Sequence, residues 1–188
     1  ATVDRATLLA NQMLALAKVE QLRHQGDDDV TDLAAVVRAV ALDLSALLAD
    51  KDIDFEIATV PAPVRAHGWM LRELTRNLLH NAIKHTPAGC SLSVRVVADA
   101  HHAALTVADS GPGISAELRT RLFQPFSAGD VRSGSGLGLA ICHEITAALG
   151  GSIALDNREA HGRVTGLDAT VRLPLAPPLA PEPGQNPG

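Results

Sequence analysis

Aromatic residues are almost missing from this sequence of 188 residues. They make up 2% of it, with three phenylalanines, one tryptophan and no tyrosine. Hydrophobic residues nevertheless reach 46%, which is enough to bury the core of one domain with a small appendage. The core must therefore be built from alanine, leucine, valine and isoleucine.

Positive charge and cysteine are also scarce. The formal net charge is −5 and the pI is near 5.9, whereas sequence-independent nucleic-acid binding needs a basic face. We therefore expect no nucleic-acid partner. Cys90 and Cys142 lack metal-ligand spacing, so we expect small buried thiols in a reducing compartment. No apolar run approaches the length of a membrane span and no signal peptide opens the sequence, which predicts a cytoplasmic segment without membrane contact.

Local sequence patterns predict helices and strands in mixed order. Helical periodicity predicts helices at 2–23, 31–48, 68–85, 116–122 and 137–149. Apolar runs predict strands at 53–58, 91–98, 102–110, 151–157 and 168–175. Thr31 is the expected N-cap of the second helix. Because strands pair in hairpins, we predict an α/β two-layer sandwich, with a mixed, mainly antiparallel sheet and helices on one face.

The first predicted helix has coiled-coil spacing. Ala6, Leu9, Met13 and Leu16 recur at alternating steps of three and four, and this seam has no partner within its own segment. Two interpretations stay open. The helix is either an ordinary amphipathic helix packed on the domain or one half of a helical hairpin or dimer stalk.

The stretch "LTRNLLHNAIKHTP" places amides inside an otherwise apolar helix. Glu73, Asn77, Asn81 and Lys84 fall on one helical face. Asparagine is a poor helix former, so its presence there needs a reason. An amide oxygen is a hard ligand suited to Mg²⁺, an amide nitrogen donates to phosphate, and lysine adds a mobile positive charge. The alternative is a solvated polar stripe.

Two glycine-rich stretches follow. In "VADSGPGIS" a predicted strand ends at Asp109, and Gly111 and Gly113 allow close approach of the backbone to a ligand. A carboxylate in an apolar pocket accepts only from donors, so it would select adenine over guanine. The alternative is a tight turn with a capping aspartate.

In "GSGLGLAI", Gly134, Gly136 and Gly138 open a helix whose N-terminal N–H groups suit an anion. The intervening "LFQPFSAGDVRSGSG" predicts a mobile lid over a nucleotide. In a chain with 15 glycines, the full D-x-G-x-G and G-x-G-x-G patterns should each occur by chance only about 0.1 times. Coincidence is the weaker explanation.

"GPGISA" also satisfies the pattern of a dinucleotide-binding loop. That interpretation needs a parallel βαβ unit and an acidic residue some twenty residues on. The corresponding region, "SAGDVRSGSG", is loop, so we reject it.

These stretches together resemble the ATP-binding catalytic domain of bacterial sensor histidine kinases, within the Bergerat-fold (GHKL) superfamily. "RNLLHNAIKHTP" resembles its N box, "DSGPGI" its G1 box, "LFQPF" its F box and "GSGLGLAI" its G2 box. The resemblance spans roughly 31–175, and 4–20 resembles the second helix of the dimerisation and phosphotransfer hairpin. The implied organisation is a helix remnant at 1–26, the catalytic domain at 30–176 and a Pro-rich disordered tail at 177–188.

The resemblance implies a Mg²⁺–ATP site. Asn81 would coordinate Mg²⁺ and Asn77 would support the metal and the phosphates. Asp109 would hold the adenine amine. The remaining residues would contact phosphate or shape the pocket and the lid: Lys84, His85, Gly111, Gly113, Ile114, Phe126, Arg132, Gly134, Gly136, Leu137, Gly138 and Leu139.

One position separates branches of the superfamily. The hydrolytic members carry glutamate where this chain has Asn77, and an amide cannot activate water at neutral pH. We therefore expect slow hydrolysis and transfer of the γ-phosphoryl group to another nucleophile. A phosphoacceptor motif is absent from the sequence, since "HEITAA" at His143 lacks the proline of such a motif. The basic residue that follows "PF" in the family is Ser127 here, and Arg132 is a possible substitute.

The sequence therefore predicts the ATP-binding kinase domain of a two-component sensor. The expected partners are the phosphoacceptor hairpin of the same protein and a response regulator, in a homodimeric parent anchored at the inner membrane. An anti-sigma-factor-type serine kinase and a nucleotide-gated binding module without transfer remain the alternatives.

Overall fold

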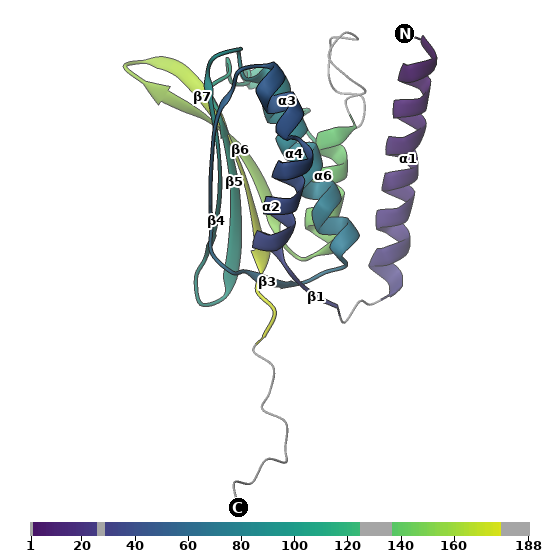
Figure 1. Cartoon of the computed structure of the whole chain (residues 1–188). Helices are drawn as coiled ribbons and strands as arrows, with labels where there is room; N and C mark the ends of the chain where they lie inside the picture. The colour runs from purple at the N-terminus through teal and green to yellow at the C-terminus, as the bar shows by residue number, and fades with distance from the viewer. Residues whose placement is uncertain (1, 26–28, 125–136, 178–188) are drawn as a thin grey trace, which may run out of the picture.

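A layer of helices covers one face of a five-stranded sheet (Figure 1). The computed structural model describes residues 2–25, 29–124 and 137–177. The strand order is β2-β4-β5-β7-β6, where β2 and β4 are parallel and the other neighbours antiparallel. This confirms the predicted α/β two-layer sandwich with a mixed, mainly antiparallel sheet.

Most strands and helices lie where the sequence predicts them, but β7 begins at Arg163, five residues before the predicted start at 168, and α5 ends at Arg119, before the predicted end at 122. The sheet contains β2 (Asp54–Thr59), β4 (Ser91–Ala98), β5 (His102–Asp109), β6 (Ser152–Ala160) and β7 (Arg163–Pro174). The helices are α1 (Thr2–Gln25), α2 (Leu33–Asp43), α3 (Ser45–Asp50), α4 (Gly68–His85), α5 (Ala116–Arg119) and α6 (Gly138–Ala148). A small antiparallel pair, β1 (Val30–Asp32) and β3 (Pro63–Arg65), lies apart from the main sheet.

The core between the two layers is aliphatic. Along β5 the buried residues alternate with half-buried ones, so that Ala103, Leu105 and Val107 face the helices. Leu74 and Leu78 of α4 are buried opposite the sheet. The aromatic side chains within the described residues, Phe55, Trp69 and Phe123, are only partly buried against this core. Leucine, isoleucine, valine and alanine therefore fill the space between the layers.

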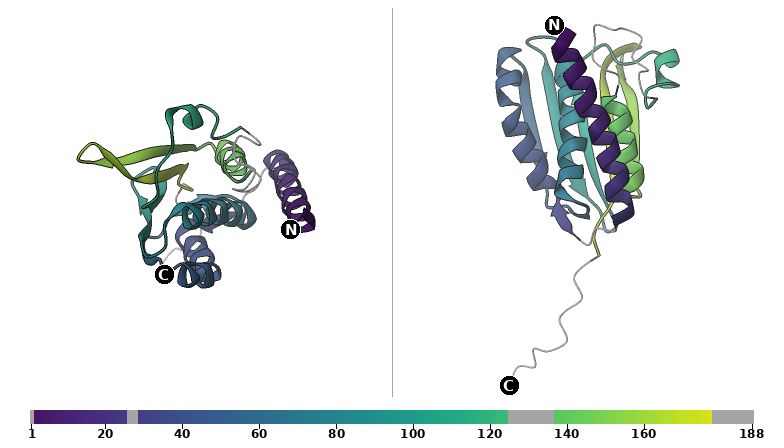
Figure 2. Two further views of the ribbon diagram at one scale, coloured as in Figure 1. Left: turned by 90° about the horizontal axis from the view of Figure 1, so that it is seen from above. Right: turned by 90° about the vertical axis from the view of Figure 1, so that its right-hand side faces the viewer.

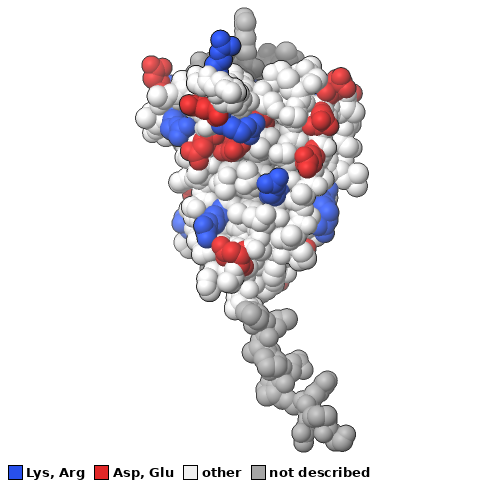
Figure 3. Space-filling view, turned by 90° about the vertical axis from the view of Figure 1, so that its left-hand side faces the viewer, with Lys and Arg blue, Asp and Glu red and all other residues white. Residues whose placement is uncertain are grey.

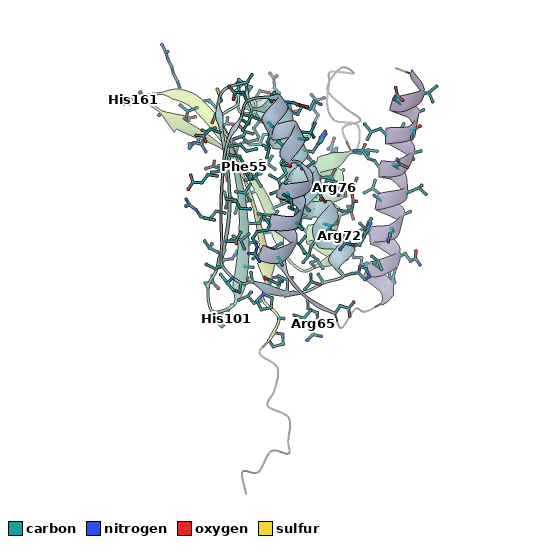
Figure 4. All side chains as sticks on the ribbon, viewed as in Figure 1. Phe55, Arg65, Arg72, Arg76, His101 and His161 are labelled. Atoms are coloured by element: carbon teal, nitrogen blue, oxygen red, sulfur yellow. The ribbon has the colours of Figure 1, made fainter. Side chains whose placement is uncertain are left out.

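The outer face of the sheet is open. Lysine and arginine side chains are interspersed there with aspartate and glutamate (Figure 3). Figure 4 shows Arg76 within the helical layer and His101 at the lower end of the sheet, in the β4–β5 turn. Arg76 of α4 forms an ion pair of 3.5 Å with Asp43 of α2.

The N-cap prediction for the second helix is wrong by one residue. Asp32 caps α2, because its Oδ1 accepts from the N–H of Ala34 at 3.1 Å and from that of Ala62 at 2.9 Å. The Thr31 hydroxyl instead donates to the Ala66 carbonyl at 2.8 Å. The expected single helix is also interrupted at Leu44, which separates α2 from α3. The change of cap arises from contacts with the distant segment 62–66.

The helix α1 lies against α6, at the edge of the helical layer (Figure 2). Ala15 and Val19 are buried there, whereas Met13 of the predicted seam is 55% exposed. The Lys18 ammonium lies 4.4 Å from the centroid of the Trp69 ring at the start of α4. The contact face thus includes Leu9 and Leu16 of the predicted seam, which are partly buried against the core, but not Met13. Among the described residues, none of the helices is both long and apolar enough to cross a membrane.

The two cysteines are free thiols in different surroundings. Cys142 is fully buried in α6, and burial raises the pKa of its thiol far above its usual value. Cys90 lies just before β4 and is only half-buried, so the expectation of two buried thiols holds for Cys142 alone.

Candidate functional site

Helix α4 runs through the helical layer, and its last turn lies at the upper end of the molecule in Figure 1. One face of this helix is polar. Glu73, Asn77 and Asn81 are half-buried on this face, whereas Leu74 and Leu78 point into the core. The sequence forms this helix because its apolar residues recur at helical spacing and His67 caps its first turn, accepting from the N–H of Trp69 at 3.1 Å. The amide-bearing stripe is therefore held in place by a well-anchored helix.

The amide of Asn77 has a defined orientation. Its Nδ2 donates to the backbone carbonyl of Glu73 at 2.8 Å and to Glu73 Oε2 at 3.4 Å. Its Oδ1 faces the first residue of α6, because a Cβ on Gly138 would lie 3.2 Å from it. The donor side of the amide is thus occupied and the acceptor side is presented to the start of α6. This arrangement brings together two residues that are 61 positions apart in the sequence.

The start of α6 is suited to an anion. Leu137 is 1% exposed and Leu139 is partly buried, so apolar side chains fix the first turn on the core. No side chain among the described residues caps this helix end. The first backbone N–H groups of an α-helix have no partner within the helix, and its dipole favours negative charge there. The predicted residues Phe126, Arg132, Gly134 and Gly136 lie outside the described residues.

Lys84 and His85 occupy the last turn of α4. The Lys51 ammonium donates to the carbonyls of Ile83 at 2.7 Å and Lys84 at 2.8 Å, which stabilises this helix end. Partial burial lowers the pKa of Lys84 below its usual value. Partial burial and the neighbouring Lys84 charge also lower the pKa of His85, and Asp109 opposes this shift. Lys51 and Lys84 thus bring two ammonium groups to this end of α4.

Asp109, at the end of β5, is 3% exposed. Its Oδ1 accepts from the backbone N–H groups of Gly111 at 2.8 Å and Leu167 at 3.2 Å. Within the described part of the chain, no hydrogen bond reaches Oδ2. A buried oxygen of this kind is costly unless a donor meets it, so the carboxylate is poised to accept from a ligand.

The loop after Asp109 touches the end of α4. A Cβ at Gly111 would lie 2.6 Å from the His85 carbonyl oxygen, so only glycine allows this approach. Gly113 has a φ of +73° and Ile114 is partly buried on the core. The structure therefore unites Asp109, Gly111 and His85 in one place, and it places Asn77 with Gly138 in another. Asn81 follows Asn77 by about one turn of α4, and Lys84 follows Asn81 by three residues. Both therefore lie on the stretch of helix between Asn77 and His85.

Some residues around the site were not predicted from the sequence. Asn157 of β6 contacts the loop after Asp109, and Arg158 contacts the carbonyl of Asp109 itself. Phe123 stacks on His143 of α6 with a centroid distance of 5.2 Å. For Asn157, the available signal was an asparagine at the end of the predicted strand 151–157, where this residue type is disfavoured. Phe123 lies in the quoted "LFQPF" stretch but was not assigned a role.

Comparison with known proteins adds the family. Residues 68–177 match the family described as histidine kinase-, DNA gyrase B- and HSP90-like ATPase, over more than half of the chain. The chain belongs to this family. The sensor protein kinase PmrB of Pseudomonas aeruginosa is 33% identical over 185 residues, which are 97% of this chain and 38% of that protein. The chain thus spans well under half the length of this relative.

Solved structures agree with this assignment to the ATPase family. The mycobacterial sensor histidine kinase MprB aligns with a TM-score of 0.70 and 30% identity, over 80% of this chain and 99% of that one. Full-length ShkA in complex with AMPPNP aligns with a TM-score of 0.75 and 27% identity, over 89% of this chain and 35% of that one. The chain is an ATP-binding domain of the two-component sensor histidine kinase type. The family match begins at the first residue of α4 and includes Asp109 and the start of α6.

Proposed function

We propose that this domain binds ATP together with Mg²⁺ and donates the γ-phosphoryl group to a histidine outside these 188 residues. The proposal depends on one observation: Asp109 is buried, and within the described residues its Oδ2 accepts no hydrogen bond. Gly111 packs closely against the His85 carbonyl beside it. Adenine has an exocyclic amine that donates a hydrogen bond, and guanine has a carbonyl in that position. The carboxylate would therefore select adenine.

The triphosphate would extend from Asp109 toward the start of α6. Lys84 and His85 would contact it from the last turn of α4, and the N–H groups at Gly138 and Leu139 would contact it from the other side. Asn81 would hold Mg²⁺, and the presented Oδ1 of Asn77 would support it. A hard cation prefers oxygen ligands, and the orientation of the Asn77 amide fits that chemistry. Bound Mg²⁺ would neutralise charge on the phosphate oxygens.

The chemistry of Asn77 favours transfer over hydrolysis. An amide takes no proton at neutral pH, so this position cannot serve as a general base for water. In the transfer step, an imidazole nitrogen of the phosphoacceptor would form a bond to the γ-phosphorus while the bond to the β–γ bridging oxygen breaks, with ADP as the leaving group. Positioning of the two reactants would supply most of the catalysis.

We also propose the partners that this chemistry requires. The phosphoacceptor would lie on a helical hairpin of the same protein, with α1 as the remnant of its second helix, in a homodimeric parent. A response regulator would accept the phosphoryl group from that histidine. The proposed setting is the cytoplasmic side of an inner-membrane sensor, with the domain itself spanning 30–176.

Two experiments test the proposal. The first is calorimetric binding of ATP, ADP and GTP, each with magnesium and with EDTA; we expect ATP to bind much more tightly than GTP, and magnesium to strengthen ATP binding. The second is single-turnover transfer from labelled ATP to a supplied phosphoacceptor hairpin, with detection of acid-labile phosphohistidine. Acid-stable phosphoserine would favour a serine kinase, and tight ATP binding without transfer would favour a nucleotide-gated binding module.

A further inference from the structure

Asn157 binds the loop that follows Asp109 through both ends of its side-chain amide. Its Oδ1 accepts from the backbone N–H of Ile114 at 2.8 Å, and its Nδ2 donates to the backbone carbonyl of Ile114 at 2.8 Å. The two bonds reproduce the pairing that a neighbouring strand would give. One side chain of β6 therefore satisfies both backbone groups of Ile114, 43 residues earlier in the chain.

The next residue, Arg158, binds the other end of the same loop. Its Nη2 donates to the backbone carbonyl of Asp109 at 2.6 Å, and its Nη1 contacts the carboxylate of Asp168. Asp168 of β7 thereby fixes the guanidinium. Successive residues of β6 thus hold Asp109 and Ile114, which are the first and last residues of the loop 109–114.

The local backbone makes these contacts possible. The β6–β7 register shifts between Arg158 and Glu159, where Thr165 is the extra residue on β7. Gly113 approaches Asn157 so closely that a Cβ there would lie 2.5 Å from Asn157 Oδ1. Gly166, likewise, would place a Cβ against the Asp109 carbonyl and the Arg158 guanidinium. The two glycines therefore leave the space that the side chains of Asn157 and Arg158 occupy.

Asp109 depends on this arrangement for the direction of its carboxylate. Its Oδ1 is held by Gly111 within the loop and by Leu167 of β7. Any shift of the loop 109–114 relative to the β6–β7 hairpin would separate these two donors and turn Oδ2 away from its present position. The orientation of the buried oxygen is thus set from outside the predicted motif.

We propose that Asn157 and Arg158 are positioning residues that set the preference of the site for adenine by holding both ends of the loop 109–114. This inference rests on the proposed binding of adenine at Asp109. The two residues act through the aspartate and need no contact with the nucleotide. Their effect should therefore fall on discrimination between purines more than on affinity for the triphosphate.

The test compares ATP with purine riboside triphosphate, which lacks the exocyclic amine, by calorimetry on the full chain. We expect the wild-type protein to bind ATP at least about tenfold more tightly than this analogue. Asn157→Ala should weaken ATP binding about tenfold and analogue binding about twofold, so that the ratio of the two dissociation constants shrinks about fivefold. Asn157→Asp should do the same, because it retains the acceptor for the Ile114 N–H but loses the donor to its carbonyl.

Glu159→Gln is the matched control, because Glu159 is exposed on β6 beyond the bulge; it should leave both affinities unchanged. Arg158→Lys, which retains a donor for the Asp109 carbonyl, tests the second contact if an Asn157 variant fails to fold, and should reduce the ratio less than Arg158→Met, which has no donor. Equal weakening of both nucleotides, or an unchanged ratio in folded variants, would overturn the inference. A wild-type protein that binds ATP no better than the analogue would instead overturn the assignment of Asp109.

Discussion

The two ends of the site differ in how completely the protein satisfies its own polar groups. At the purine end, Asp109 is buried and its Oδ1 accepts two backbone N–H groups. At the phosphate end, the side chains of Asn81 and Lys84 make no hydrogen bond within the described part of the chain. Asn77 is intermediate, because its side-chain Nδ2 donates to the Glu73 carbonyl whereas its Oδ1 faces the start of α6.

The difference separates recognition from chemistry. A preorganised pocket lowers the cost of ordering groups on binding, which suits a base that must be distinguished from others. Charged phosphates and a hydrated metal ion exchange ligands during transfer, which suits side chains that remain free to change partners. In the proposed site, selectivity would thus be built into the sheet, and the groups for catalysis would come from the helices.

Asp109→Asn should have the largest effect on ATP binding and tests the assignment of the purine end most directly. The amide retains an acceptor for the two N–H groups but turns its NH₂ toward the donor amine of adenine, so we expect ATP affinity to fall about 100-fold. Calorimetry with ATP measures this change. Asp50→Asn, at an exposed position of α3, is the control and should bind ATP normally. Unchanged affinity in Asp109→Asn would reject the assignment of the purine end.

Gly111→Ala should have the next largest effect. The new Cβ would lie 2.6 Å from the His85 carbonyl, so the loop or the end of α4 must move. Because backbone yields less readily than a side chain, we expect ATP affinity to fall about 30-fold and the midpoint of thermal unfolding to drop by several degrees. Gly138→Ala provides the comparison at the phosphate end, where the contact with Asn77 Oδ1 would be 3.2 Å. If the two variants lose equal affinity, the purine end is no more rigid than the phosphate end.

Asn81→Ala should remove the magnesium dependence of ATP binding. We expect about a tenfold loss of affinity in magnesium and little change in EDTA, since the residue would contact the metal and not the base. Binding of ATP under both conditions, with circular dichroism to verify the fold, measures this. His80→Ala removes an exposed neighbour on the same helix and should behave as wild type. An Asn81 variant that responds to magnesium as the wild type does would exclude this residue as the ligand.

The smallest expected effect concerns His85. Its pKa is lowered in the folded state, chiefly because partial burial disfavours the charged imidazole. At a pH between this lowered pKa and the ordinary value of about 6.5, the unfolded state binds more protons than the folded state. The contribution of His85 to the free energy of unfolding is therefore fully present above pH ~6.5 and is lost as the pH falls through the folded-state pKa. His85→Tyr does not titrate in this range. The wild type should therefore lose slightly more thermal stability than the variant between pH 7.5 and 5.5, and parallel curves would contradict the assignment.

The sequence predicted those elements whose signals are local. The helix 68–85 has its observed bounds, because periodic leucines and a proline just beyond it define both ends. The hairpin at 99–102 was predicted for a similar reason. The motifs around Asn77, Asp109 and Gly138 pointed to a nucleotide, because glycines and amides at these spacings have few other uses.

Other features depend on contacts between distant segments. Asp32 caps the helix in place of Thr31 because the N–H of Ala62, a distant residue, also donates to the Asp32 carboxylate and holds it at the helix start. The buried face of α1 includes Leu9 and Leu16 of the heptad seam but not Met13, because the packing of α1 against α6 decides which residues are covered. The role of Asn157 follows from its two hydrogen bonds to Ile114, 43 residues away, and the sequence around it contains no motif.

The contact between Lys18 and Trp69 gives the molecule an optical reporter. Trp69 is the sole indole in the sequence, and it lies at the junction of the first helix with the kinase fold. Its emission will respond to the distance of that ammonium group. Detachment of the first helix can therefore be followed by intrinsic fluorescence in real time, without any label.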